Sequence, residues 1–301
     1  MEATDDFLSF ALFVAFFPQL VAGPIERARD LLPQLMEKQP TTTEDILNGV
    51  TRILWGMMKK IVIADNIAIF VNQIYGPLFS GASNMELILA TWLFAFQIYF
   101  DFSAYSDIAI GLARLLGIHL NENFKHPYVS RNVAEFWRRW HISLSSWLRD
   151  YLYIPLGGSR KGLSRTAINV VIVFFLGGLW HGADFKFVIW GLWIGFAIAI
   201  YNIVAARLNI HHDAERQVYW HDLIGIFFTF QIMAIAWVFF RADSVNHAMQ
   251  IFDHLLHSPT WTTIDQWDAT THYEVQRLLL FVCGIHLLRG MKLDQRLHQL
   301  R

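Results

Sequence analysis

Long apolar segments separated by polar loops constrain this 301-residue chain more than any other feature. The run from 85 to 116 is long enough to cross the hydrocarbon core of a bilayer, which takes about 20 helical residues. Further apolar runs cover 166–180, 187–206 and 222–240. Only backbone whose polar groups are satisfied within the protein can lie in lipid, and single apolar runs of this length achieve that as helices. The sequence therefore predicts an all-α, polytopic integral membrane protein.

Three less regular segments bring the expected number of membrane segments to about seven. Residues 7–23 contain Pro18, which removes a backbone donor, so a broken or re-entrant helix or a short span is expected there. Residues 46–75 form an apolar run interrupted by two lysines and an aspartate, and we expect it to span with its lysines at an interface. The run 275–288 is short and contains a histidine.

The composition excludes several classes of function. Only 16% of the residues are charged, whereas soluble proteins have about 25%. The net charge of -1 provides no basic excess to neutralise phosphates, so no nucleic-acid partner is expected. The single cysteine, Cys283, excludes an internal disulfide and a cysteine-based metal site.

The loop 117–165 is too polar to span a membrane but is rich in tryptophan and tyrosine. Its eight Lys and Arg residues include Arg138 and Arg139. Aromatic rings at headgroup depth and basic groups that reach outward are typical of interfacial helices. Glu135 precedes the two arginines by three and four residues, so local ion pairing is available. The basic excess places this loop in the cytoplasm and the acidic N-terminus outside.

His181 ends the apolar run 166–180, within the sequence GGLWHG. An ionisable side chain at membrane depth is costly and therefore suggests a functional role. The neighbouring glycines allow other backbone or a ligand to approach closely, and Trp180 supplies an apolar wall. A neutral imidazole at this place could accept a proton from an alcohol as a general base. The alternative is a structural histidine that is hydrogen-bonded to a backbone carbonyl.

His141, which follows Trp140, is the second candidate, although an interfacial histidine can be tolerated without a role. In the run 85–116, Asp101 and Tyr105 share one helix face, as do Ser103 and Asp107. The two aspartates lie on different faces. Either hydroxyls on neighbouring turns satisfy these carboxylates, or the carboxylates line a polar passage.

The other histidines that we considered as ligands are expected in solvated loops, and no HExxH motif or comparable set completes a metal site. These residues are His211, His212, His221, His247, His254, His257 and His272.

Five stretches together resemble the membrane-bound O-acyltransferase family. They are FPQLVAGPIERARDLLPQL (17–35), GMMKKIVIADNIA (56–68), FQIYFDFSAYSDIAIGLARLLGI (96–118), NFKHPYVSRNVAEFWRRWHISLSSWLRDYLYIPLGGSRKG (123–162) and LGGLWHGADFKFVIWG (176–191). The pair WRRWHISLS and GGLWHG is especially specific. The details resemble the alginate O-acetylation branch more than the teichoic-acid D-alanyl branch.

The resemblance implies one membrane domain, residues 1–301, with helices around a tunnel in a bacterial cytoplasmic membrane. It implies transfer of an acetyl group from a cytoplasmic thioester similar to acetyl-CoA toward hydroxyls of an extracytoplasmic polysaccharide, with no bound cofactor and no metal. A separate extracytoplasmic protein would complete the transfer. His181 would be the catalytic histidine and His141 the supporting one. Candidates for the substrate or tunnel wall are Asp101, Tyr105, Asp107, Trp140, Trp180, Arg138 and Arg139.

Two departures from the family pattern and three alternatives accompany this interpretation. Family members usually carry further helices before the FPQL segment, so a fragment or an incomplete tunnel is one expectation. Ala104 stands where the family often has glycine, and the alanine in place of glycine would tighten a helix contact. The alternatives are transfer of D-alanyl or another acyl group to a cell-envelope polymer, a transporter or channel, and a scaffold subunit that recruits a partner.

Overall fold

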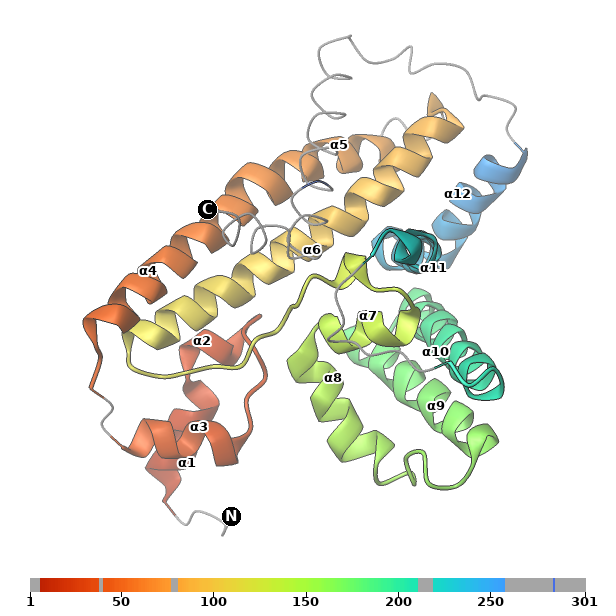
Figure 1. Cartoon of the computed structure of the whole chain (residues 1–301). Helices are drawn as coiled ribbons and strands as arrows, with labels where there is room; N and C mark the ends of the chain where they lie inside the picture. Colours follow the sequence, from red (N-terminus) through yellow and green to blue (C-terminus); the bar gives the residue numbers. More distant parts are fainter. Residues whose placement is uncertain (1–5, 38–39, 77–80, 211–218, 258–283, 285–301) are drawn as a thin grey trace. The chain divides into compact units, whose positions relative to one another are not determined.

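The computed structural model describes residues 6–37, 40–76, 81–210, 219–257 and 284. All regular secondary structure in these ranges is helical, as Figure 1 shows. This result confirms the all-α prediction.

Four helical segments within the described ranges are long and apolar enough to cross a membrane. They correspond to the four long apolar runs of the sequence, and they confirm a multi-pass membrane protein. These segments are α6 (Asn84–Leu115), α9 (Leu163–His181), α10 (Phe185–Arg207) and Trp220–Arg241, in which the short η5 (Trp220–Asp222) leads into α11 (Leu223–Arg241).

The N-terminal apolar run is a broken helix, as the proline predicted. Helix α1 (Phe7–Ala15) stops at Phe16, and α2 (Phe17–Leu20) has Pro18 in its first turn, where the missing N–H costs nothing. Helix α3 (Ala28–Met36) follows.

The predicted span 46–75 differs from the expectation. It consists of α4 (Thr43–Met58), the π-helical η1 (Lys59–Ala64) and α5 (Asp65–Tyr75), and it is not one of the four candidate spans. The π-helical η1 divides the segment into two shorter helices, and the lysines of η1 form ion pairs with aspartates of α6. The predicted segment 275–288 lies outside the described residues apart from position 284.

The polar loop 117–165 contains several short helices. They are η3 (Pro127–Val129), α7 (Val133–Arg139), α8 (Ile142–Leu148) and the π-helical η4 (Arg149–Tyr153). The break between α7 and α8 falls at Trp140 and His141. Helix α12 (Val245–His257) corrects a further expectation, because His247, His254 and His257 lie on this helix and not in a loop.

The chain forms two compact units, and α6 contributes to both. The first unit comprises 1–66, 97–125 and 140–147, and the second comprises 67–96, 126–139 and 148–301.

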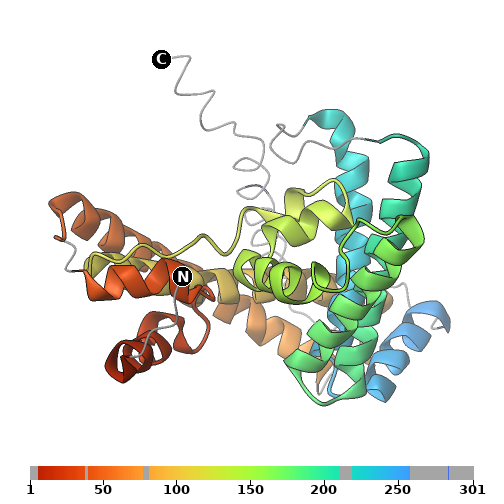
Figure 2. The ribbon, with the colours of Figure 1, turned by 90° about the horizontal axis from the view of Figure 1, so that it is seen from below.

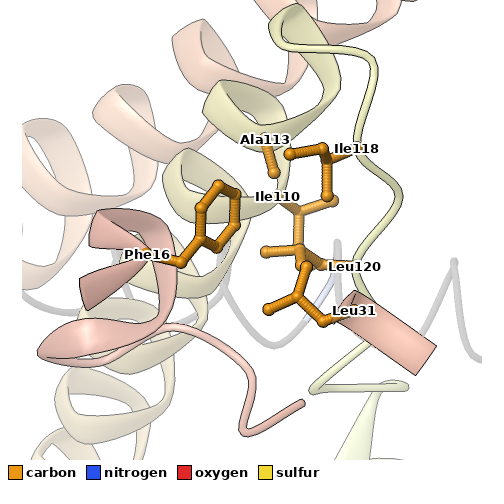
Figure 3. Packing of buried hydrophobic residues seen from close by; sticks show 6 residues of the cluster. All are labelled: Phe16, Leu31, Ile110, Ala113, Ile118 and Leu120. Carbon is orange, nitrogen blue, oxygen red and sulfur yellow. The ribbon is translucent and has the colours of Figure 1, made fainter. Parts of the chain in front are cut away.

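An apolar cluster in the first unit joins the N-terminal helices to the C-terminal end of α6. The side chains shown in Figure 3 pack around Phe16, which is 5% exposed. Its other members are Leu31, Ile110, Ala113, Ile118 and Leu120. This packing places the residues that follow α6 beside the N-terminal stretch 17–35.

Helices α9 and α10 of the second unit lie side by side, as Figures 1 and 2 show. Gly178 of α9 faces Gly191 of α10, and a Cβ at Gly178 would lie 2.3 Å from the Phe187 carbonyl oxygen. Gly191 and Gly195 form a GxxxG pattern, which lets helix backbones approach closely in membranes. The close approach fixes the position of the C-terminal end of α9.

We expect Gly178→Ala to lower the free energy of unfolding by about 1–3 kcal/mol, because the added methyl group meets backbone that cannot move aside. The neighbouring Gly177 provides a matched control. Among the described residues, a Cβ there meets only the Leu148 side chain, at 3.7 Å, and alanine favours a helix over glycine by up to about 1 kcal/mol. Gly177→Ala is therefore expected to leave stability unchanged or slightly higher. Unfolding in detergent measures both, and equal stability of the two variants would contradict the backbone packing.

Candidate active site

His181 is the last residue of α9, and aromatic rings surround its half-buried imidazole. The ring centroid of Trp180 lies 4.9 Å away, that of Trp190 5.0 Å and that of Phe240 5.3 Å. Phe187 lies at 6.4 Å. These neighbours come from α9, α10 and α11, so the packing of three apolar helices creates the environment of this histidine.

Within the described ranges, no hydrogen bond involves the His181 imidazole. A histidine kept only for structure would normally satisfy a ring nitrogen with a carbonyl or a hydroxyl group. The backbone-carbonyl alternative of the sequence analysis is therefore not observed among these residues. As far as the described residues are concerned, both ring nitrogens are available to a substrate.

We call the rings of Trp180, Phe187, Trp190 and Phe240 the aromatic wall of His181, and further contacts hold this wall in place. Trp190 packs against Trp237, whose indole N–H donates to the Tyr128 hydroxyl at 3.0 Å. That hydroxyl donates in turn to the Ala95 carbonyl at 2.7 Å. Trp237 is 1% exposed, so the wall is part of the core of the second unit.

Two buried indole N–H groups, one on a ring that packs against His181 and one on the ring next to it, have no hydrogen-bond partner among the described residues. They are the N–H groups of Trp190 and Trp137, whose rings lie 5.8 Å apart. A buried donor without an acceptor is costly, and such groups in native proteins call for an explanation. An acceptor on a bound molecule would satisfy them.

His141 is also buried, with 5% of its surface exposed, and it belongs to the first unit. Its backbone has φ of 43°, which is uncommon for a residue other than glycine. The Nδ1 atom lies 3.2 Å from Oδ1 of Asn123, and the ring packs edge-on against Phe102 at 4.7 Å. His141 is thus an enclosed, hydrogen-bonded side chain.

The other predicted wall residues have diverse surroundings. Trp140 is buried against Phe124, whereas Trp180 is 59% exposed. Arg138 is exposed, and Arg139 donates to Glu135 at 2.7 Å. The expected local ion pairing of Glu135 is confirmed for the second arginine.

The aspartates of α6 are satisfied by cations and not by neighbouring hydroxyls, which corrects that alternative. Asp107 accepts from Lys59 at 2.7 Å and from Arg52 at 2.9 Å. Asp101 pairs with Lys60 at 2.7 Å. The cause is the GMMKK stretch of α4 and η1, whose lysines face α6. Tyr105, predicted beside Asp101, is 47% exposed.

Sequence reasoning overlooked three kinds of residue at these two sites. It did not identify the ring partners Trp190 and Phe240, nor Asn123 beside His141. The FKFVIWG and NENFK stretches offered only aromatic and polar residues close to recognisable motifs. In the described part of the chain, no group of three or more His, Cys, Asp or Glu residues lies close enough to hold a metal ion.

Comparison with known proteins places these sites in a family context. The model of the membrane-bound O-acyltransferase family matches residues 4–245. A "probable alginate O-acetylase" of Pseudomonas putida is 41% identical over 259 residues, which are 86% of this chain and 51% of that protein. A peptidoglycan O-acetyltransferase of Helicobacter pylori is 41% identical over 252 residues, covering 81% of this chain and 46% of that protein.

A teichoic acid D-alanyltransferase of Bacillus subtilis is 27% identical over 267 residues, covering 82% of this chain and 66% of that protein. The greater identity to the O-acetylase confirms the branch predicted from the motifs. The chain spans about half the length of the first two relatives.

Proposed function

We propose that this chain, which belongs to the membrane-bound O-acyltransferase family, transfers an acetyl group from a thioester to a hydroxyl group of a cell-envelope polysaccharide. The observation that carries the proposal is the environment of His181. Its imidazole lies among aromatic rings of three helices and has no hydrogen-bond partner in the described ranges. The names of the alginate and peptidoglycan relatives support an acetyl donor and a glycan acceptor.

The proposed reaction uses His181 as a general base. Its neutral imidazole takes the proton of the acceptor hydroxyl while the hydroxyl oxygen attacks the carbonyl carbon of the thioester. The tetrahedral intermediate collapses, the carbon–sulfur bond breaks, and the imidazolium returns the proton to the thiolate. The products are an O-acetyl ester, a free thiol and a regenerated neutral histidine. The aromatic wall would keep water away from the thioester.

The two indole N–H groups that have no partner among the described residues support the same assignment. During attack, the carbonyl oxygen of the thioester becomes an oxyanion, and catalysis needs donors directed at it. The N–H groups of Trp190, in the aromatic wall, and of Trp137, packed against it, are buried donors without an acceptor among the described residues. A bound acyl group would supply one.

The remaining roles extend this proposal. His141 would support the transfer by positioning the donor or a proton, and the tunnel would run through one membrane domain of residues 1–301. The thioester would arrive from the cytoplasm of a bacterium, and a separate extracytoplasmic protein would pass the acetyl group to the polymer. The wall candidates are Asp101, Tyr105, Asp107, Trp140, Trp180, Arg138 and Arg139.

The test is ester formation in cells. The chain is produced in a bacterium that exports an unacetylated polysaccharide, and base-labile acetate on the polymer is measured against an empty-vector control. Acetyl esters that require the chain are expected. D-alanyl esters in their place would favour the alternative acyl group. No ester, with the chain in the membrane at the level of an active relative tested in parallel, would contradict the proposal.

A further inference from the structure

Residues 119–123 follow α6 and are held by side chains from the N-terminal third of the chain. This stretch, the 119–123 segment, has no regular secondary structure. The Gln34 side chain accepts the His119 N–H at 2.8 Å and donates to the His119 carbonyl at 3.2 Å. Glu26 accepts the backbone N–H of Asn121 at 2.6 Å and its side-chain amide at 2.7 Å.

Glu122 and Asn123 complete the attachment of this segment. Arg52 donates to Glu122 at 2.6 Å while it also binds Asp107 of α6. Asn123 is 1% exposed, and its side-chain amide donates to the Ser106 hydroxyl at 3.1 Å. Side chains of Glu26, Gln34 and Arg52 thus hold this irregular segment in place through hydrogen bonds and an ion pair.

Asn123 in turn holds the start of α8, where His141 lies. Its backbone carbonyl accepts the Ile142 N–H at 2.9 Å. Its side-chain Oδ1 accepts the Ser143 N–H at 3.3 Å and the Ser143 hydroxyl at 3.0 Å. Asn123 therefore satisfies N–H groups that the first turn of a helix leaves without partners.

These bonds determine which ring nitrogen of His141 carries the proton. A backbone N–H can only donate, so the amide atom of Asn123 that it meets must be the carbonyl oxygen. That oxygen is an acceptor only, and His141 Nδ1 lies 3.2 Å from it. The Ser143 hydroxyl lies 3.5 Å from Nδ1, and because its proton goes to the same Asn123 oxygen, it can only accept from that nitrogen. In the neutral ring, Nδ1 therefore carries the hydrogen, and Nε2 is the basic nitrogen.

We propose that Asn123 is a positioning residue that fixes the Nδ1–H tautomer and the ring orientation of His141. Phe102 packs edge-on against the same ring and Phe124 stacks on it, so the ring plane is defined on two sides. The contribution of this device to acyl transfer rests on the proposed function. The tautomer itself does not depend on that function.

The first test reads the tautomer without any activity measurement. The chain is labelled with ¹⁵N-histidine, reconstituted into liposomes and examined by solid-state NMR, with His141→Gln used to identify the His141 signals. Wild type is expected to show a protonated Nδ1 and an unprotonated Nε2. Asn123→Ala is expected to lose this single tautomer, whereas Asn123→Asp, which keeps an acceptor oxygen, is expected to retain it. An Nε2–H tautomer in wild type, or an unchanged tautomer in Asn123→Ala, would overturn the proposal.

The second test reads acyl transfer by the same variants at matched membrane levels. Partners that orient metal-ligating histidines contribute about 10–100-fold, and we expect a loss of the same order for Asn123→Ala because Asn123 orients a histidine in the same way. Asn123→Asp is expected to recover most of the rate. Asn48, an exposed asparagine of α4, provides a control, and Asn48→Ala is expected to behave as wild type.

The two tests separate the possible failures. Wild-type transfer in Asn123→Ala, together with an altered tautomer, would overturn the positioning role and leave the proposed function intact. No transfer by wild type would overturn the proposed function, and the NMR result would still decide the tautomer.

Discussion

Replacing His181 with glutamine is expected to abolish acyl transfer while the chain remains in the membrane at its normal level. Glutamine is polar and similar in length, but it cannot take a proton from an alcohol near neutral pH. General-base catalysis contributes about 10²–10⁴-fold, so transfer should fall by that factor. Base-labile acetate on the acceptor polysaccharide measures the loss.

The same variant is expected to remain folded, which separates chemistry from structure. No hydrogen bond within the described ranges involves the His181 imidazole, so its removal leaves no described partner unsatisfied. The melting temperature in detergent should therefore change little. His257→Gln, at an exposed position of α12, is the control and should retain transfer. Equal acetate with His181→Gln and wild type would exclude the general-base role.

The membrane helices could be predicted because their signal is contained within each segment. The apolar run 166–180 corresponds to α9, which begins three residues earlier, at Leu163, and ends one residue later, at His181. The run 46–75 was harder to interpret, because its lysines gain partners only from another helix. Helix α12 carries charged and polar residues along much of its length, so hydropathy gave no indication of it.

The site could be predicted only where the sequence placed its parts together. Trp180 and His181 are neighbours in the chain and pack edge to face. Phe240 lies 59 positions after His181, and their contact depends on how α9, α10 and α11 pack. The hydrogen bond between Asn123 and His141 likewise depends on tertiary packing. It also involves a positive φ at His141, which no local sequence pattern predicts.

Replacing Glu135 is expected to have a large effect on stability, because its carboxylate lies between two arginines inside the second unit. Its side chain is 0% exposed and that of Arg131 is 2% exposed. Oε2 accepts the backbone N–H of Arg131 at 3.1 Å and its Nε at 2.9 Å. Oε1 accepts Arg131 Nη2 at 3.1 Å and Arg139 Nη2 at 2.7 Å. The four acceptor sites of the carboxylate are thus filled.

We expect Glu135→Ala to lower the free energy of unfolding by about 3–5 kcal/mol, because it leaves buried positive charge without its counterion. Chemical denaturation in detergent micelles measures this quantity. Asp253→Ala provides the matched control, because Asp253 also pairs at i,i+4 spacing but is 75% exposed in its side chain. An exposed pair contributes about 0–1 kcal/mol, so this control should be nearly neutral.

A triple variant distinguishes loss of charge balance from loss of packing. Replacing Arg131 with Met, Glu135 with Leu and Arg139 with Met removes both signs of charge and keeps most of the side-chain volume. Apolar replacement of a complete buried ion cluster is often neutral or stabilising, so the triple variant should recover most of the stability lost in Glu135→Ala. If the triple variant were as unstable as Glu135→Ala, the hydrogen bonds around the carboxylate would be the main source of stability. Recovery would instead show that Glu135 is required because the two arginines are buried beside it.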